Sequence, residues 1–98
     1  MLIPWKGNTT NEAFSNPKNL PLKIEGFSIV NKSGGATSVN VYLFGDSYSY
    51  CIAPNPVQLS TGEMYESQNP IVLLATERVK IKANGSVDYN FTFSNLTE

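Results

Sequence analysis

The stretch that decides the fold is Val79–Phe93, which reads VKIKANGSVDYNFTF. Apolar and polar residues alternate in it on both sides of an Asn-Gly pair. A period of two is typical of a β-strand with one buried face, so we expect two half-buried strands joined by a turn. The apolar residues of the two strands are Val79, Ile81, Ala83, Val87, Tyr89, Phe91 and Phe93.

The turn between these strands must bring both apolar rows to the same face of the sheet. A two-residue loop at Asn84-Gly85 would place the rows on opposite faces. A three-residue loop, Ala83-Asn84-Gly85, aligns them, with Gly85 in the left-handed conformation that a residue without a Cβ adopts easily. The cross-strand pairs of this predicted hairpin are Ile81 with Val87, Val79 with Tyr89 and Lys80 with Asp88.

Length and composition describe one small domain with little net charge. The chain has 98 residues, of which 41% are hydrophobic, and this is enough for one core. Seven basic and eight acidic residues give a net charge of -1. Arg78, Lys80 and Lys82 share one face of a predicted strand, and we interpret them as a solvated outer face. Because no larger basic surface is evident, we expect no nucleic-acid partner.

Most of the chain is a series of short strands separated by turns. The apolar phase shifts between Ile24 and Phe27, which predicts a β-bulge at Gly26. The run 71–75, IVLLA, is continuously apolar, so we expect it to be buried on both faces. No segment has a helical period. The sequence therefore predicts an all-β domain over residues 20–98, an antiparallel β-sandwich or jelly roll of seven or eight short strands, with a small barrel as the alternative.

Residues 1–19 have a different character, because neither a strand period nor a helix period is sustained in them. Asn, Thr and Ser dominate, and we expect an extended N-terminal arm. The arm cannot bury its own apolar side chains. They either fold back onto the chain's own domain or dock on a neighbouring subunit, and both alternatives stay open. The side chains concerned are Met1, Leu2, Ile3, Trp5 and Phe14.

The chain offers little material for catalysis or metal binding. It has no histidine, which removes the commonest general base and the commonest transition-metal ligand. Its one cysteine, Cys51, lies in a strand-like context, and we expect a buried, inert thiol. The glycine turns lack the strand-to-helix context of a phosphate loop. We therefore expect no catalytic, cofactor-binding or metal-binding residue, no small-molecule substrate and no enzymatic activity.

Four aromatic residues bracket the predicted turn Gly45-Asp46-Ser47. If all four face outward, they form an aromatic patch too large for a solitary monomer. Three alternatives stay open: they pack into a second sheet, form a subunit interface, or provide a platform on which sugars stack. Together with the apolar residues of the arm they make up the predicted interface. The four residues are Tyr42, Phe44, Tyr48 and Tyr50.

In residues 57–94 a strand, a Leu-x-x-Gly turn, a short strand, an apolar strand and the predicted hairpin follow one another. The residues that carry this order are Leu59, Gly62, Pro70, Ile71, Leu73, Val79, Ile81, Gly85, Val87 and Asp88. In this respect the second half of the chain resembles the C-terminal portion of small all-β structural proteins of tailed bacteriophages. The resemblance implies a role in the virion, as a capsid decoration, head-fibre, neck or tail component. It transfers no catalytic residue.

These features predict a non-enzymatic structural subunit of a bacteriophage virion, assembled in the host cytoplasm through protein–protein contacts. The expected partners are further copies of the chain and other virion proteins. The start of the chain, MLIPWKGN, has no extended apolar core, so we expect neither a signal peptide nor a membrane partner. The alternative function is a small carbohydrate-binding β-sandwich module that uses the tyrosine-rich turn. An enzyme comes third.

Overall fold

The computed structural model describes residues 2–15 and 20–95. All regular structure in these residues is β-strand, and the prediction of an all-β, antiparallel fold is confirmed. The eight strands are β1 (Leu2–Ser15), β2 (Leu22–Asn31), β3 (Thr37–Phe44), β4 (Ser49–Cys51), β5 (Val57–Leu59), β6 (Met64–Ser67), β7 (Ile71–Leu73) and β8 (Arg78–Asn95).

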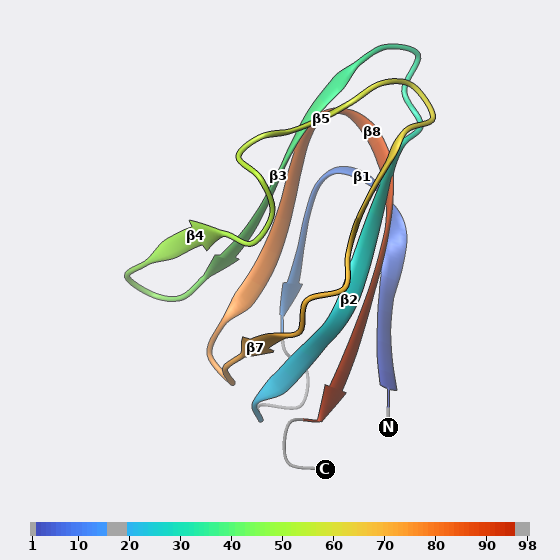
Figure 1. Cartoon of the computed structure of the whole chain (residues 1–98). Helices are drawn as coiled ribbons and strands as arrows, with labels where there is room; N and C mark the ends of the chain where they lie inside the picture. The colour runs from blue at the N-terminus through green and yellow to red at the C-terminus, as the bar shows by residue number, and fades with distance from the viewer. Residues whose placement is uncertain (1, 16–19, 96–98) are drawn as a thin grey trace.

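Strand β8 is the centre of a single curled sheet. Its first part, residues 78–83, pairs with β3, and its last part, residues 87–95, pairs with β2. β1 runs antiparallel to β8 along both of these parts. Figure 1 shows β1 and β8 arching over together at one end of the molecule, so that each of them contributes to both halves of the sheet.

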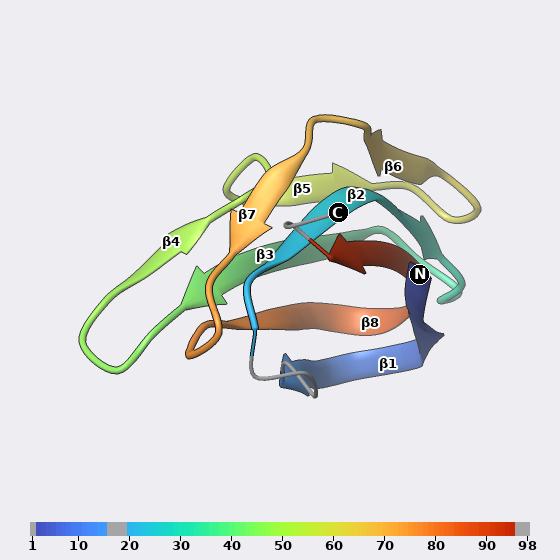
Figure 2. The same ribbon diagram turned by 90° about the horizontal axis from the view of Figure 1, so that it is seen from below.

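The arch divides the sheet into two halves. The β2 half holds β2, β6, β7 and the last part of β8. The β3 half holds β3, β4, β5 and the first part of β8. Figure 2 shows the first part of β8 in orange and its last part in red, separated from each other and each beside a part of β1. The arrangement is similar to a sandwich, but one continuous sheet forms it.

Aromatic contacts join the two halves across the core. Phe14, from the part of β1 that belongs to the β3 half, stacks on Phe93 of the β2 half, with ring centroids 4.2 Å apart. The ring of Trp5 lies 5.4 Å from that of Phe14, so the two parts of β1 also face each other. Along β2, β3 and β8 buried residues alternate with more exposed ones, as expected for strands with one inward face. The large side chains that are fully buried are Leu22, Ile24, Ile29, Val39, Val41, Leu43, Leu73, Val79, Ile81, Val87, Phe91 and Phe93.

The predicted β-bulge in β2 is confirmed. The pairing of β2 with β8 shifts register between Ile24 and Gly26. In a regular strand Ile24 and Phe27 would point to opposite faces, but with the bulge both are buried. A Cβ on Gly26 would lie 3.0 Å from the carbonyl oxygen of Ser67, so a larger side chain has little room here.

The predicted hairpin at Ala83-Asn84-Gly85 is wrong, because β8 continues through these residues. Lys80 pairs with Tyr42 of β3 and with Ala13 of β1. It does not pair with Asp88. An alternation that keeps its phase across a three-residue loop is also the alternation of one unbroken strand, so the pattern fits both structures. β1 and β3 decide between them, because they occupy the hydrogen-bonding positions on both sides of the first part of β8.

Gly85 has a different role from the one predicted. Among the described glycines a positive φ occurs at Gly62, not at Gly85. A Cβ on Gly85 would overlap the Oγ1 atom of Thr37 and would lie 2.9 Å from the side chain of Ser33. The connection from β2 to β3 therefore passes close against β8 at this position, and only glycine leaves room for it.

The prediction that residues 71–75 are buried on both faces is also wrong. Leu73 is fully buried, whereas Val72 and Leu74 are 45% and 49% exposed. β7 is three residues long and pairs with β2 along one edge. As a short outer strand it turns one face to the core and the other to solvent, so a continuous apolar run leaves apolar side chains outside.

Substitutions at Gly85 distinguish the continuous strand from a hairpin. We expect Gly85→Ala to lower the free energy of unfolding by about 1–3 kcal/mol through overpacking, and Gly85→Asn to lower it further because its side chain is larger. In a hairpin with a left-handed Gly85 the order would reverse, because Asn tolerates that conformation better than Ala. Urea denaturation measures both, with Gly34→Ala as the control, since a Cβ there meets nothing within 4 Å.

Candidate functional site

The structure places the predicted arm on its own domain. Met1 and the side chain of Leu2 lie outside the described part of the chain. Phe14 is buried in the core, and Ile3 and Trp5 are partly buried against it. Of the two alternatives for the arm, the structure therefore has the one in which these side chains pack on the same chain.

Trp5 contacts three aromatic rings, those of Phe14, Tyr89 and Phe91. Its ring centroid lies 4.6 Å from that of Tyr89 and 4.9 Å from that of Phe91. Aromatic pairs at such distances stabilise a fold by about 0.5–1.5 kcal/mol each, beyond the burial of their area. The backbone of the same segment pairs with β8 from Leu2 to Ser15. Docking of the arm on a neighbouring subunit would first have to break this pairing.

The outer side of β3 and β8 brings aromatic and basic side chains together. Tyr42 lies directly opposite Lys80, and Phe44 lies directly opposite Arg78. The guanidinium carbon of Arg78 is 5.8 Å from the centroid of the Phe44 ring, which is a cation–π contact. Lys82 continues the basic row along β8. We call Tyr42, Phe44, Arg78, Lys80 and Lys82 the basic–aromatic face.

Strand alternation fixes the composition of this face. The inward positions of β3 and of the first part of β8 are apolar and buried, so the intervening side chains point outward. Residues directly opposite each other on neighbouring antiparallel strands have Cβ atoms about 4.5–5.5 Å apart, close enough for side-chain contact. Tyr42 and Phe44 are half-buried by these neighbours and are not part of the hydrophobic core. Tyr42 and Phe44 therefore do not pack into a second sheet, which was one of the three alternatives for the aromatic residues.

An open hollow of about 800 Å³ lies on the basic–aromatic face. Tyr42, Phe44, Lys80 and Lys82 line it, and the turn 45–49 completes its wall. The hollow thus combines ring surfaces, two ammonium groups and the hydroxyl groups of the turn. Such a mixture of apolar surface and a few polar groups is typical of a ligand-binding surface.

Tyr48 anchors the turn beside the hollow. Its hydroxyl group donates a hydrogen bond to the carboxylate of Glu77, which is buried and also accepts the backbone N–H of Leu74 at 2.8 Å. This hydrogen bond is the main reason why the pKa of Tyr48 rises to about 12. The tyrosine ring itself stays 45% exposed. The hydrogen bond to Glu77 thus holds the turn in place, and the Tyr48 ring is partly exposed beside it.

Large apolar side chains are also exposed at separate positions on the short outer strands. Met64 lies opposite Val30 and Val72 lies opposite Lys23, near the two ends of β2, and Tyr50 lies beside β3 in the other half of the sheet. Tyr50 of β4 and Met64 of β6 are 50% and 54% exposed, and Val72 and Leu74 at β7 are exposed to a similar degree. We call these four residues the apolar margin. Tyr50 was among the predicted interface residues, but the other three were missed. The signal for Val72 and Leu74 was the continuous apolar run, which we had interpreted as a strand buried on both faces.

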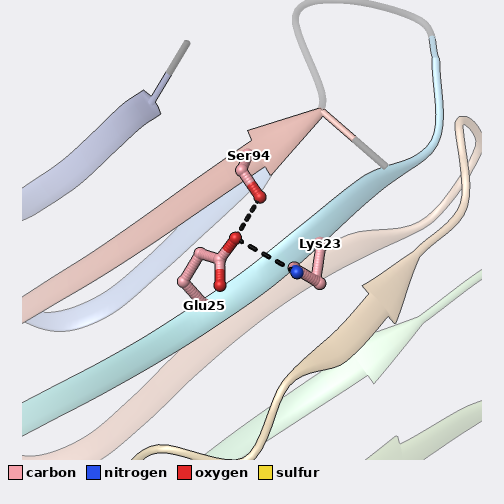
Figure 3. Close-up of polar contacts among 3 residues, drawn as sticks. All are labelled: Lys23, Glu25 and Ser94. Carbon is pink, nitrogen blue, oxygen red and sulfur yellow. Dashed lines mark hydrogen bonds and ion pairs between the residues drawn. The ribbon is translucent and has the colours of Figure 1, made fainter. Parts of the chain in front are cut away.

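A smaller hollow of about 380 Å³ lies beside the bulge in β2 and is lined by Glu25 and Glu66 among others. Glu25 accepts a hydrogen bond from the hydroxyl group of Ser94, and its carboxylate lies 3.4 Å from the Nζ atom of Lys23 (Figure 3). The hydrogen bond from Ser94 and, after it, the contact with Lys23 lower the pKa of Glu25. These contacts favour the ionised form of the Glu25 carboxylate and fix its position on the surface of the sheet.

The remaining candidates carry little chemistry. Cys51 is half-buried rather than fully buried, and it lies opposite Tyr42 in the pairing of β3 with β4. Residues 2–15 and 20–95 contain no group of three or more Cys, Asp or Glu side chains placed to hold a metal ion. They also contain no helix long and apolar enough to cross a membrane.

No protein-family model, no curated protein and no solved structure matches this chain. Its function therefore has to be inferred from the two surfaces described above, the basic–aromatic face and the apolar margin.

Truncating Trp5 tests whether the arm belongs to its own core. We expect Trp5→Ala to lower the free energy of unfolding by about 3 kcal/mol, because the ring leaves a gap in an aromatic cluster. Lys6→Ala, at the exposed neighbouring position, is the matched control and should change stability by less than about 0.5 kcal/mol. Urea denaturation gives both values. An unchanged stability of Trp5→Ala combined with a smaller mass in solution would instead show that the arm docks in trans.

The Tyr48–Glu77 hydrogen bond predicts a late tyrosine titration. Because the folded protein raises the pKa of Tyr48 from 10.0 to about 12, this group's contribution to stability is complete below pH 10 and is lost as the pH rises from 10 to 12. The tyrosinate absorbance of the wild type minus that of Tyr48→Phe should therefore have its midpoint at about 12. In Glu77→Gln the midpoint should move back toward 10.0, and a wild-type midpoint already at that value would contradict the assignment.

Proposed function

We propose that this chain is a non-enzymatic structural subunit that assembles with further copies of itself through the apolar margin. The observation that carries the proposal is the exposure of four large apolar side chains, those of Tyr50, Met64, Val72 and Leu74, each about half exposed or more. Three of them lie on short outer strands, and Leu74 directly follows one.

Burial of the margin supplies the driving force for this assembly. Each Å² of apolar surface removed from water stabilises a complex by about 25 cal/mol, so exposed side chains of this size favour association. Edge strands add a second contribution, because their unpaired backbone groups accept a further strand. β6 and β7 each pair with β2 along one edge, and both are only a few residues long.

The virion is the setting we propose for this assembly. The order of turns and apolar strands in residues 57–94 resembles that of small structural proteins of tailed bacteriophages. Particles of this kind are built from many copies of small subunits, and a subunit with a polar face and an apolar margin suits such repeated contacts. Other virion proteins are then its further partners, and the virion is its location.

The arm does not support this proposal. Phe14 belongs to the core of its own domain and Ile3 and Trp5 pack against that core, so the alternative in which the arm docks on a neighbour has no support from them. Support for assembly comes instead from Met64, Val72 and Leu74, none of which was among the predicted interface residues.

The second candidate function is a small carbohydrate-binding module. One observation favours it: the ring of Tyr48 is 45% exposed beside a hollow of about 800 Å³. Aromatic rings with one free face, next to polar groups that fix orientation, are typical of surfaces that bind sugars.

Charges placed in the apolar margin test the assembly. We expect the wild type to have a mass in solution of at least twice the 10.8 kDa of the chain, and Val72→Lys/Leu74→Lys to return it to that of the monomer. The matched control is Ala36→Lys/Asn84→Lys, which adds the same charge at two exposed positions outside the margin. Light scattering measures the mass, and circular dichroism checks that both variants are folded. A monomeric wild type, or an unchanged mass of the margin variant, would contradict the proposal.

A further inference from the structure

We propose that the basic–aromatic face binds a linear acidic polysaccharide, one that carries carboxylate groups on part of its sugar rings. This inference deepens the second candidate function and rests on it. It does not depend on the apolar margin, since the two surfaces share no residue.

The charges of the face are free to act on a ligand. Arg78, Lys80 and Lys82 are two residues apart along β8, so their side chains emerge on one side at intervals of about 7 Å. Within residues 2–15 and 20–95 no acidic side chain lies within ion-pair distance of any of the three, and the ion pair found there joins Lys23 to Glu25. A row of unpaired cations on a strand matches a linear polymer with repeated negative charges better than it matches a compact ligand.

The rings beside this row suit sugars. Tyr42 lines the hollow directly opposite Lys80, and Tyr48, which is 45% exposed, is also among its lining residues. A sugar ring has an apolar C–H face that packs on an aromatic ring, while its hydroxyl groups bond to polar neighbours. Ser47 and Ser49 line the same hollow and offer such neighbours.

Asp46 sets a direction for the ligand. It lines the hollow at the turn, on the far side of Phe44 from Tyr42 along the chain, and it would repel a carboxylate there. We therefore place the carboxylate groups of the polymer near Lys80 and Lys82. The turn then receives an uncharged part of the polymer, near the hydroxyl groups of Ser47 and Ser49.

A single-stranded nucleic acid fits the face less well. It carries one charge per nucleotide, whereas the chain has a net charge of -1 and a pI near 5.3, far from the basic character of nucleic-acid-binding domains. Stacked bases also need rings with a free face, and the ring of Phe44 is occupied by Arg78. A polysaccharide that carries fewer charges per unit length than a nucleic acid is repelled less by the negative net charge of the chain, and it needs fewer aromatic rings with a free face.

Titration calorimetry on the full chain tests the proposal with three probes: an oligogalacturonate, its fully methyl-esterified form, and an oligothymidylate of similar length. The methyl ester has the same sugar rings without the charges, so it isolates the role of the carboxylates. We expect the oligogalacturonate to bind, and the methyl ester to bind at least about tenfold more weakly, because charge-assisted hydrogen bonds are lost. The oligothymidylate should bind more weakly than the oligogalacturonate.

Two variants locate the site. Lys80→Gln/Lys82→Gln should weaken binding of the oligogalacturonate at least about tenfold, since both proposed partners of the carboxylates are removed. Lys6→Gln/Lys32→Gln removes the same charge at two exposed positions elsewhere and should change affinity by less than about twofold, as expected from screening of distant charges. Val72→Lys/Leu74→Lys should still bind the oligogalacturonate, which separates this site from assembly.

Each of the opposite results overturns the proposal in a distinguishable way. Equal affinity for the acid and its methyl ester would leave a carbohydrate-binding function but refute the role of charge. Absence of binding to either sugar would refute the carbohydrate-binding function as well. Tighter binding of the oligothymidylate than of the oligogalacturonate would show that the face binds nucleic acid. An equal loss of affinity in the two double-lysine variants would show that the binding site does not lie on β8.

Discussion

The backbone hydrogen bonds of β8 hold this molecule together, because each half of the sheet is attached to a different part of that strand. β1 lies along β8 on one side, while β3 and then β2 follow on the other. Its inward side chains, from Val79 to Phe93, enter the core of both halves. A register shift of one residue would expose this apolar row and bury Lys80 and Lys82, so the pairing is strongly specified.

The positions of the strands relative to β8 also decide what the surface offers. Where β3 lies beside β8, the outward row of one strand is aromatic and that of the other is basic, and Tyr42 and Phe44 meet Lys80 and Arg78. Three of the large exposed apolar side chains, those of Tyr50, Met64 and Val72, lie instead on the short strands β4, β6 and β7, none of which pairs with β8. The two proposed activities use different residues, although β4 carries both Ser49 of the hollow and Tyr50 of the apolar margin.

Local patterns in the sequence were sufficient for the strands β2 to β7 and for the bulge at Gly26, because these depend on neighbouring residues alone. They were not sufficient for the choice of partners. Whether the chain turns or continues at Ala83-Asn84-Gly85 depends on β1, a segment far away in the sequence whose polar composition concealed a strand. Because the pairing of β1 with β8 was not predicted, the packing of Trp5 on Tyr89 and Phe91 was not predicted either. Predicting the basic–aromatic face requires knowing that β3 pairs with β8, and the alternation of apolar and polar residues within a strand does not indicate which strand is its neighbour.

The pairing of β1 with β8 also bears on how the chain reaches this structure. Leu2 pairs with Ser94, so the sheet is completed by contacts between residues that are very far apart in sequence. Closing such large loops costs entropy before any contact forms, and folds of this kind form slowly. During synthesis β8 leaves the ribosome after the seven other strands, and until then β1, β2 and β3 lack their shared neighbour. The nascent chain therefore carries open strand edges for most of its elongation, and this interval is when it is most exposed to pairing with the wrong chain.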